Sequence, residues 1–132
     1  MINLSRIDKM SIHIKVDIEG LYELHNAFKK VYTNKSFDDI TVIFDRAIIN
    51  FIKGNIVEIN LRLQYKEGGD SEFILQDNHI TWYLEDEDVD SAISQLENCI
   101  KLGYFYPAEF IRTKVQKNRK LDYIYCELHN SE

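Results

Sequence analysis

Four carboxylates spaced along residues 86–97 could form a calcium site, because they match positions 1, 3, 5 and 12 of an EF-hand loop. They are Asp86, Asp88, Asp90 and Glu97. Two features oppose this interpretation: Ser91 stands at the sixth position, where the sharp turn of the loop requires glycine, and residues 80–84 before it have the pattern of a strand. The same acids suit the positive N-terminal end of a helix. We therefore expect an acidic helix start and keep a calcium loop as the alternative.

The acidic run could also bind another protein. Clustered carboxylates steer basic proteins during association and fix the orientation in which they dock. Neighbouring aromatic side chains can supply the buried anchors of such an interface. The predicted partner-binding residues are Glu85, Asp86, Glu87, Asp88, Asp90, Trp82 and Tyr83. The competing interpretation is a solvated run of charge that only improves solubility.

No motif for catalysis or for a cofactor is visible. No two histidines have a spacing that places them on one helical face, as a helical metal site requires. There is no Gly-x-Ser-x-Gly motif, and Gly68-Gly69 falls between predicted strands without the lysine and helix of a phosphate loop. We predict no enzyme, metal or cofactor site, and we expect the histidines to be surface or hydrogen-bonded polar residues. They are His13, His25, His79 and His129.

The charge balance argues against nucleic acid as a partner. Sixteen basic and 22 acidic residues give the 132-residue chain a net charge of −6, which repels phosphate backbones. A basic cluster at residues 112–120 fits the C-terminal end of a predicted helix. No run of 18 apolar residues occurs, and Cys99 and Cys126 are too few for a disulfide framework. We predict a cytoplasmic protein that binds neither nucleic acid nor membrane and keeps both cysteines as buried thiols.

The periodicity of the first half predicts a strand, a helix and an ambiguous segment. Alternation over residues 10–18 predicts a half-buried strand ended by Gly20, and apolar residues at helical spacing predict a helix over residues 21–32. Residues 38–53 have the β-branched composition of a strand but also a wide helical stripe. Ser36 and Asp39 resemble a helix start and Gly54 suits a helix end, so we predict a second helix.

The second half predicts three strands, two helices and a last strand. Residues 57–65 alternate as one long strand, and residues 73–76 and 80–84 complete an antiparallel meander. Apolar spacing predicts a third helix over residues 89–100, closed by Gly103. Pro107 fits the start of a fourth helix, which contains Phe110 and Val115, and residues 121–128 form the last strand.

These elements predict one α+β domain over residues 1–132. The order β-α-α-β-β-β-α-α-β indicates one mainly antiparallel sheet of about five strands, with about four helices on one face. Tyrosines are the remaining feature that bears on function. Tyr123 and Tyr125 alternate with apolar residues of the last strand, and Tyr104-Phe105-Tyr106 precedes Pro107. These rings would be exposed for binding, or would pack under the fourth helix.

In size, acidity and predicted α+β layout, the chain resembles the immunity proteins of bacterial toxin systems. The resemblance implies a non-catalytic domain that binds and neutralises a cognate toxin, with the acidic residues occupying a basic surface such as the substrate groove of a nuclease. The alternative is a regulatory domain that binds a small ligand or a metal ion. An enzyme whose residues converge only in the fold is a third possibility.

Overall fold

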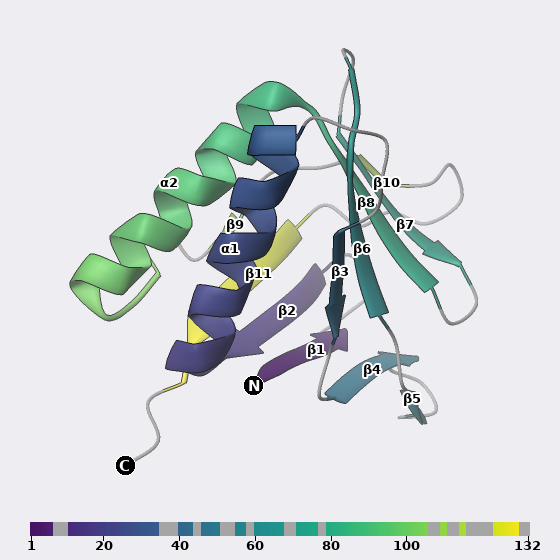
Figure 1. Ribbon diagram of the computed structural model, residues 1–132. Helices are drawn as coiled ribbons and strands as arrows, with labels where there is room; N and C mark the ends of the chain where they lie inside the picture. The colour runs from purple at the N-terminus through teal and green to yellow at the C-terminus, as the bar shows by residue number, and fades with distance from the viewer. Residues whose placement is uncertain are drawn as a thin grey trace.

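The computed structural model describes residues 1–6, 11–34, 40–43, 46–50, 55–57, 60–67, 71–76, 79–105, 109–110, 114–115 and 123–129. Within these residues the chain forms two helices, α1 (Ile18–Asn34) and α2 (Asp86–Leu102), and two β-sheets (Figure 1). The predicted α+β class is therefore confirmed. The predicted single sheet with four helices is wrong.

Helix α1 begins earlier than its apolar stripe because Asp17 caps it. The Asp17 Oδ1 atom accepts a hydrogen bond from the Gly20 backbone N–H at 2.8 Å, and the Asp17 carbonyl accepts one from Leu21. Gly20, which the alternation suggested as the end of the preceding strand, lies in the first turn of the helix. It is buried there against the backbone of Met1, and a Cβ atom at this position would collide with the Met1 carbonyl oxygen.

Helix α2 follows its sequence pattern closely. Its buried residues are spaced along one face: Val89, Ala92, Leu96 and Cys99. Gly103 ends the helix in the left-handed conformation, with φ 82°, and its N–H donates to the Cys99 carbonyl at 2.8 Å. The two helices run antiparallel beside each other, and α1 contacts both sheets through β2, β3 and β6 (Figure 1).

The first sheet combines both ends of the chain. Its six strands have the order β5-β4-β1-β2-β11-β9, in which antiparallel and parallel pairs alternate. Strand β2 lies between β1, which is antiparallel to it, and β11, which is parallel to it. The strands span Ile2–Arg6 (β1), Ser11–Val16 (β2), Arg46–Asn50 (β4), Asn55–Val57 (β5), Glu109–Phe110 (β9) and Tyr123–Leu128 (β11).

The second sheet has five strands in the order β10-β7-β8-β6-β3. Strand β8 lies between β7, its antiparallel neighbour, and β6, which runs parallel to it. The predicted meander is therefore wrong, because the chain leaves β6, forms β7 one position away and returns between the two as β8. The strands span Ile40–Ile43 (β3), Asn60–Tyr65 (β6), Glu72–Gln76 (β7), His79–Leu84 (β8) and Lys114–Val115 (β10).

Both additional helices that the sequence predicted are replaced by strands where the structure describes them. Residues 40–43 and 46–50 are β3 and β4, in accordance with the β-branched composition that competed with the helical stripe. Residues 109–110 and 114–115 are β9 and β10, which contradicts the fourth helix, whereas Pro107 lies outside the described residues. The predicted long strand over residues 57–65 is divided between β5 and β6, which belong to different sheets.

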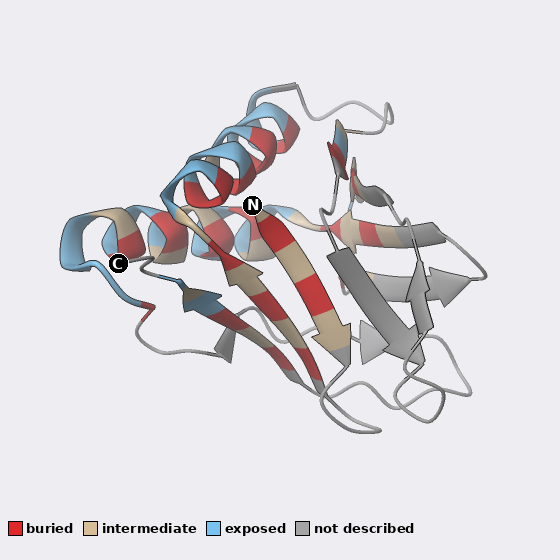
Figure 2. Ribbon diagram, turned by 90° about the horizontal axis from the view of Figure 1, so that it is seen from below, coloured by how far each residue is buried: buried red, intermediate tan, exposed pale blue. Residues whose placement is uncertain are grey.

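The core fills the space between the helices and the sheets. The inward faces of α1 and α2 are buried and their outward faces are exposed (Figure 2). In β2, Ile12, Ile14 and Val16 are buried, while the alternate residues His13 and Lys15 are half-buried on the opposite face. This alternation leaves a polar face of the first sheet on the side away from the helices.

Candidate functional site

The acidic start of α2 is organised around Glu85. The Glu85 Oε1 atom accepts a hydrogen bond from the Asp88 backbone N–H at 2.7 Å, which makes Glu85 the N-cap. The Glu85 N–H donates in turn to the hydroxyl of the buried Ser71 at 3.0 Å. The acids of the first turn then lie at the positive end of the helix dipole. Part of this acidic run therefore stabilises the helix itself.

Three of the predicted binding acids remain exposed: Asp86, Glu87 and Asp90, here called the acidic patch. Asp86 also accepts a hydrogen bond from the Tyr65 hydroxyl at 3.3 Å, which ties the patch to the end of β6. Asp88 and Glu85 are half-buried. The structure thus brings all five predicted carboxylates together, and three of them face solvent.

Of the two predicted aromatic anchors, Trp82 is misplaced. Its side chain is fully buried, and its ring meets that of Phe28 edge to face with centroids 5.7 Å apart and planes at 87°. Trp82 therefore belongs to the core and cannot contact a partner. Tyr83 follows it in β8, is half-buried and points to the other face of the sheet, as strand alternation requires. It remains a candidate contact.

The calcium-loop alternative is wrong. Residues 86–102 are helical, and because successive residues rotate by about 100° around a helix, Asp86, Asp88 and Asp90 point in different directions. They cannot surround one ion as a loop would. Among the described residues, no group of three or more His, Cys, Asp or Glu side chains is arranged to hold a metal ion.

Two histidines form ion pairs with glutamates. His25 Nε2 lies 3.2 Å from Glu97 Oε1 and joins the middle of α1 to α2, and His13 Nε2 lies 3.0 Å from Glu127 Oε2 across β2 and β11. The interpretation of His13 and His25 as hydrogen-bonded polar residues is confirmed. His129 is exposed, and the side chain of His79 lies outside the described residues.

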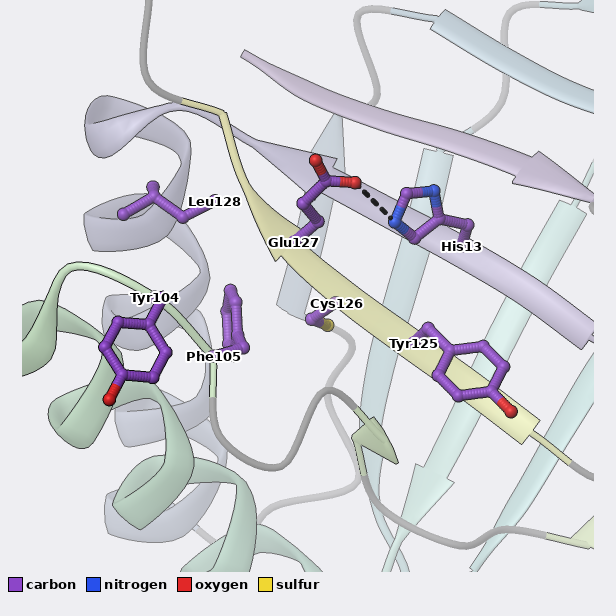
Figure 3. Close-up of a pocket in the computed structure, with 7 residues that line it drawn as sticks. All are labelled: His13, Tyr104, Phe105, Tyr125, Cys126, Glu127 and Leu128. Atoms are coloured by element: carbon purple, nitrogen blue, oxygen red, sulfur yellow. Dashed lines mark ion pairs between the residues drawn. The ribbon is translucent and has the colours of Figure 1, made fainter.

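The His13–Glu127 pair belongs to an open pocket of about 430 Å³ along β11 (Figure 3). Figure 3 shows Tyr104, Phe105 and Leu128 on one side of the strand and His13 and Tyr125 on the other. The pocket is lined by His13, Tyr104, Phe105, Tyr125, Cys126, Glu127 and Leu128. Sequence periodicity did not identify it, because β11 meets β2 and the end of α2 only in the fold.

The thiol in this pocket is poorly suited to nucleophilic chemistry. Cys126 is buried, and burial raises the pKa of its thiol well above its ordinary value, with the nearby Cys99 as a further cause. The pKa of Cys99 is raised to about 11 by burial. Both thiols are therefore protonated at neutral pH, whereas the thiolate is the reactive form. The predicted burial of both cysteines is confirmed.

Four large apolar side chains are exposed at one end of the helix pair: Ile18, Tyr22, Leu102 and Tyr104, here called the apolar patch. The start of α1 and the end of α2 lie at the same end of the molecule in both overall views (Figures 1 and 2). The exposure of Tyr104 confirms one of the two interpretations of the tyrosine run, while the adjacent Phe105 is buried. Tyr106 and the side chain of Tyr123 lie outside the described residues.

Comparison of the chain with protein-family models, with curated proteins and with solved structures gives no match. In the part of the chain that the structure describes, neither helix has the length and apolar character that crossing a bilayer demands. The function is accordingly argued from the residues themselves.

Proposed function

We propose that this protein is a non-catalytic protein-binding domain, specifically an immunity protein that binds and neutralises a cognate bacterial toxin through an acidic surface. The observation that carries the proposal is the charge on the outward side of the helices. The exposed acidic residues of α1 and α2 are Glu19, Glu23, Asp86, Glu87, Asp90 and Glu97. The exposed basic residues of these helices are Lys29, Lys30 and Lys101.

This imbalance favours a basic partner. Carboxylates on one side of a protein create a field that raises the rate of encounter with a positively charged surface. The acidic patch has a fixed geometry, because Glu85 caps the helix and Tyr65 bonds Asp86. A fixed row of acids can match a fixed row of basic residues, such as those in the substrate groove of a nuclease.

The proposal is tested first by capture and then by kinetics. The tagged protein is used to recover partners from a lysate of the cells that produce it, at low and at high salt, and bound proteins are identified by mass spectrometry. A basic protein recovered in stoichiometric amount supports the proposal, and the absence of any specific basic protein contradicts it.

The kinetic test assigns the surface. The double variant Glu87→Gln/Asp90→Asn should slow association with the recovered partner several-fold and reduce its salt dependence, because two steering charges are removed. The matched control is Lys29→Gln/Lys30→Gln, which removes two exposed charges of opposite sign from α1. It should leave association unchanged or slightly faster. Equal association rates for the acidic variant and the native protein would exclude the acidic patch from the binding surface.

A second candidate function, the binding of a small ligand, is favoured by the pocket beside β11. Its volume of about 430 Å³ falls in the range of small-molecule sites, and its lining combines aromatic rings with one ion pair. Screening a fragment library by NMR tests this function. Shifts confined to His13, Tyr125 and Glu127 would support it, and a library without such binders would count against it.

A further inference from the structure

We infer that the partner is held mainly at the apolar patch, by a basic amphipathic segment whose apolar side chains cover the patch and reach the adjoining pocket. This inference rests on the proposed function, since it takes the partner to be a protein with a basic surface. It assigns the binding energy to the end of α2 opposite the acidic patch.

The first observation is the exposure of the patch itself. Ile18, Tyr22, Leu102 and Tyr104 are 50%, 47%, 53% and 55% exposed, although each is large and mainly apolar. Single exposed apolar residues are ordinary, but several gathered at one end of a molecule mark an interaction site. Tyrosine contributes much contact area for little loss of side-chain entropy, which suits it to interfaces.

The second observation is that the patch continues into the pocket. Leu128 pairs with Val16 in neighbouring strands, and the His129 N–H donates to the Val16 carbonyl at 2.6 Å, which brings the end of β11 to the start of α1. Leu128 and Tyr104 line the same pocket. An apolar side chain of a partner lying on the patch therefore has a hollow beside it to fill, which is the arrangement of a binding hot spot.

The third observation is the charge around the patch, which selects the occupant. Glu19, Glu23 and Glu127 are exposed there, against a single exposed lysine, Lys101, in the described residues of α1, α2 and β11 near this end. A segment whose apolar residues are flanked by lysine or arginine would satisfy these carboxylates. A second copy of this chain would instead bring the same acids face to face, and an anionic membrane surface would be repelled.

The two surfaces are well separated. Helix α2 has 17 residues, so its ends lie about 25 Å apart at 1.5 Å per residue. The acidic patch would mainly raise the rate of encounter, whereas the apolar patch would set the rate of dissociation, because apolar burial acts only after contact. The two contributions can therefore be removed one at a time.

The test uses a synthetic amphipathic peptide of leucine and lysine, about four helical turns long, and a scrambled peptide of the same composition. Both are titrated into the isotope-labelled full chain and followed by NMR. We expect the amphipathic peptide to shift the resonances of Ile18, Tyr22, Leu102 and Tyr104 and the scrambled peptide to leave them in place. The variant Tyr22→Ser/Tyr104→Ser should weaken binding roughly tenfold or more.

The matched control is Tyr32→Ser, because Tyr32 has similar exposure, 45%, but lies at the other end of α1. Its affinity for the peptide should equal that of the native protein. Equal shifts from both peptides, shifts confined to the acidic patch, or an unchanged affinity of the Tyr22→Ser/Tyr104→Ser variant would each overturn the inference. A concentration-dependent dimer in analytical ultracentrifugation that this variant abolishes would also overturn it, because the occupant would then be a second copy.

The captured partner separates this inference from the proposed function. A basic protein that binds the native chain and the Tyr22→Ser/Tyr104→Ser variant equally well would overturn the inference and leave the proposed function standing. A variant that loses the captured basic partner, while Tyr32→Ser retains it, supports both. If no basic protein is captured, the proposed function fails even where the amphipathic peptide occupies the patch.

Discussion

Replacing Gly20 with alanine is expected to destabilise the protein, although alanine is the better helix former. Gly20 lies in the first turn of α1, where the substitution alone would gain about 1 kcal/mol of helix propensity. The added Cβ atom, however, would overlap the Met1 carbonyl oxygen and lie 2.8 Å from the Met1 carbonyl carbon and 3.0 Å from Ile2 Cγ1. Backbone atoms cannot turn aside as a flexible side chain can, so the start of β1 has to move.

That movement has a cost that exceeds the gain. Overpacking a well-packed site costs about 1–3 kcal/mol, and the displaced segment carries the fully buried Ile2 and the ion pair of the Met1 ammonium with Asp17. We expect a net loss of about 1 kcal/mol in the free energy of unfolding, the difference between these two terms.

Urea denaturation of the native protein and the Gly20→Ala variant measures this difference. The matched control is Asn26→Ala at an exposed position of the same helix, which should gain about 0.5 kcal/mol because only propensity changes. If Gly20→Ala is as stabilising as Asn26→Ala, the close approach of Met1 to α1 is refuted, and with it the position of β1 against this helix.

Three further predictions concern titration and burial. The Met1 ammonium, and then the Gly20 N–H, lower the pKa of Asp17 below 3.8, so its ionised form stabilises the fold above about pH 4 and this contribution is lost as the pH falls through the lowered pKa; Asp17→Asn should flatten the pH dependence of unfolding in that range. Trp82 is the only tryptophan and is fully buried, so its fluorescence should be blue-shifted and resist quenching by acrylamide; ready quenching in the folded protein would contradict its place in the core. Cys99 and Cys126 should react slowly with a thiol reagent at pH 8 and rapidly once urea unfolds the protein, because burial raises both pKa values.

The elements with a single clear period could be predicted from the sequence. The stripe of Leu21, Leu24 and Phe28 locates α1, and the alternation of Ile12 and Ile14 locates β2; all five side chains are buried. Residues 38–53 could not be assigned in this way, because their apolar positions fit a helical face while their β-branched residues fit strands. The choice was made by pairing with β6 and β1, which are distant in the sequence.

The functional surfaces divide along the same line. The acids from Glu85 to Asp90 are contiguous, so the sequence alone could predict their patch. Trp82 was expected at the surface because it adjoins those acids, but strand alternation places it inward, opposite Tyr83. The apolar patch could not be predicted, because Ile18 and Tyr104 are far apart in sequence and meet only when α1 and α2 pack antiparallel.

The parallel pairing of β2 with β11 determines when this protein can fold. Ser11 lies beside Tyr123, more than one hundred positions later, so the middle of the first sheet closes only when the two segments meet. Closing such a long loop has a large entropic cost and slows folding. During synthesis, β2 would emerge from the ribosome well before its neighbour and would wait with one edge open. A folding rate limited by this late step, and a need for protection of the nascent chain, follow from the position of one strand.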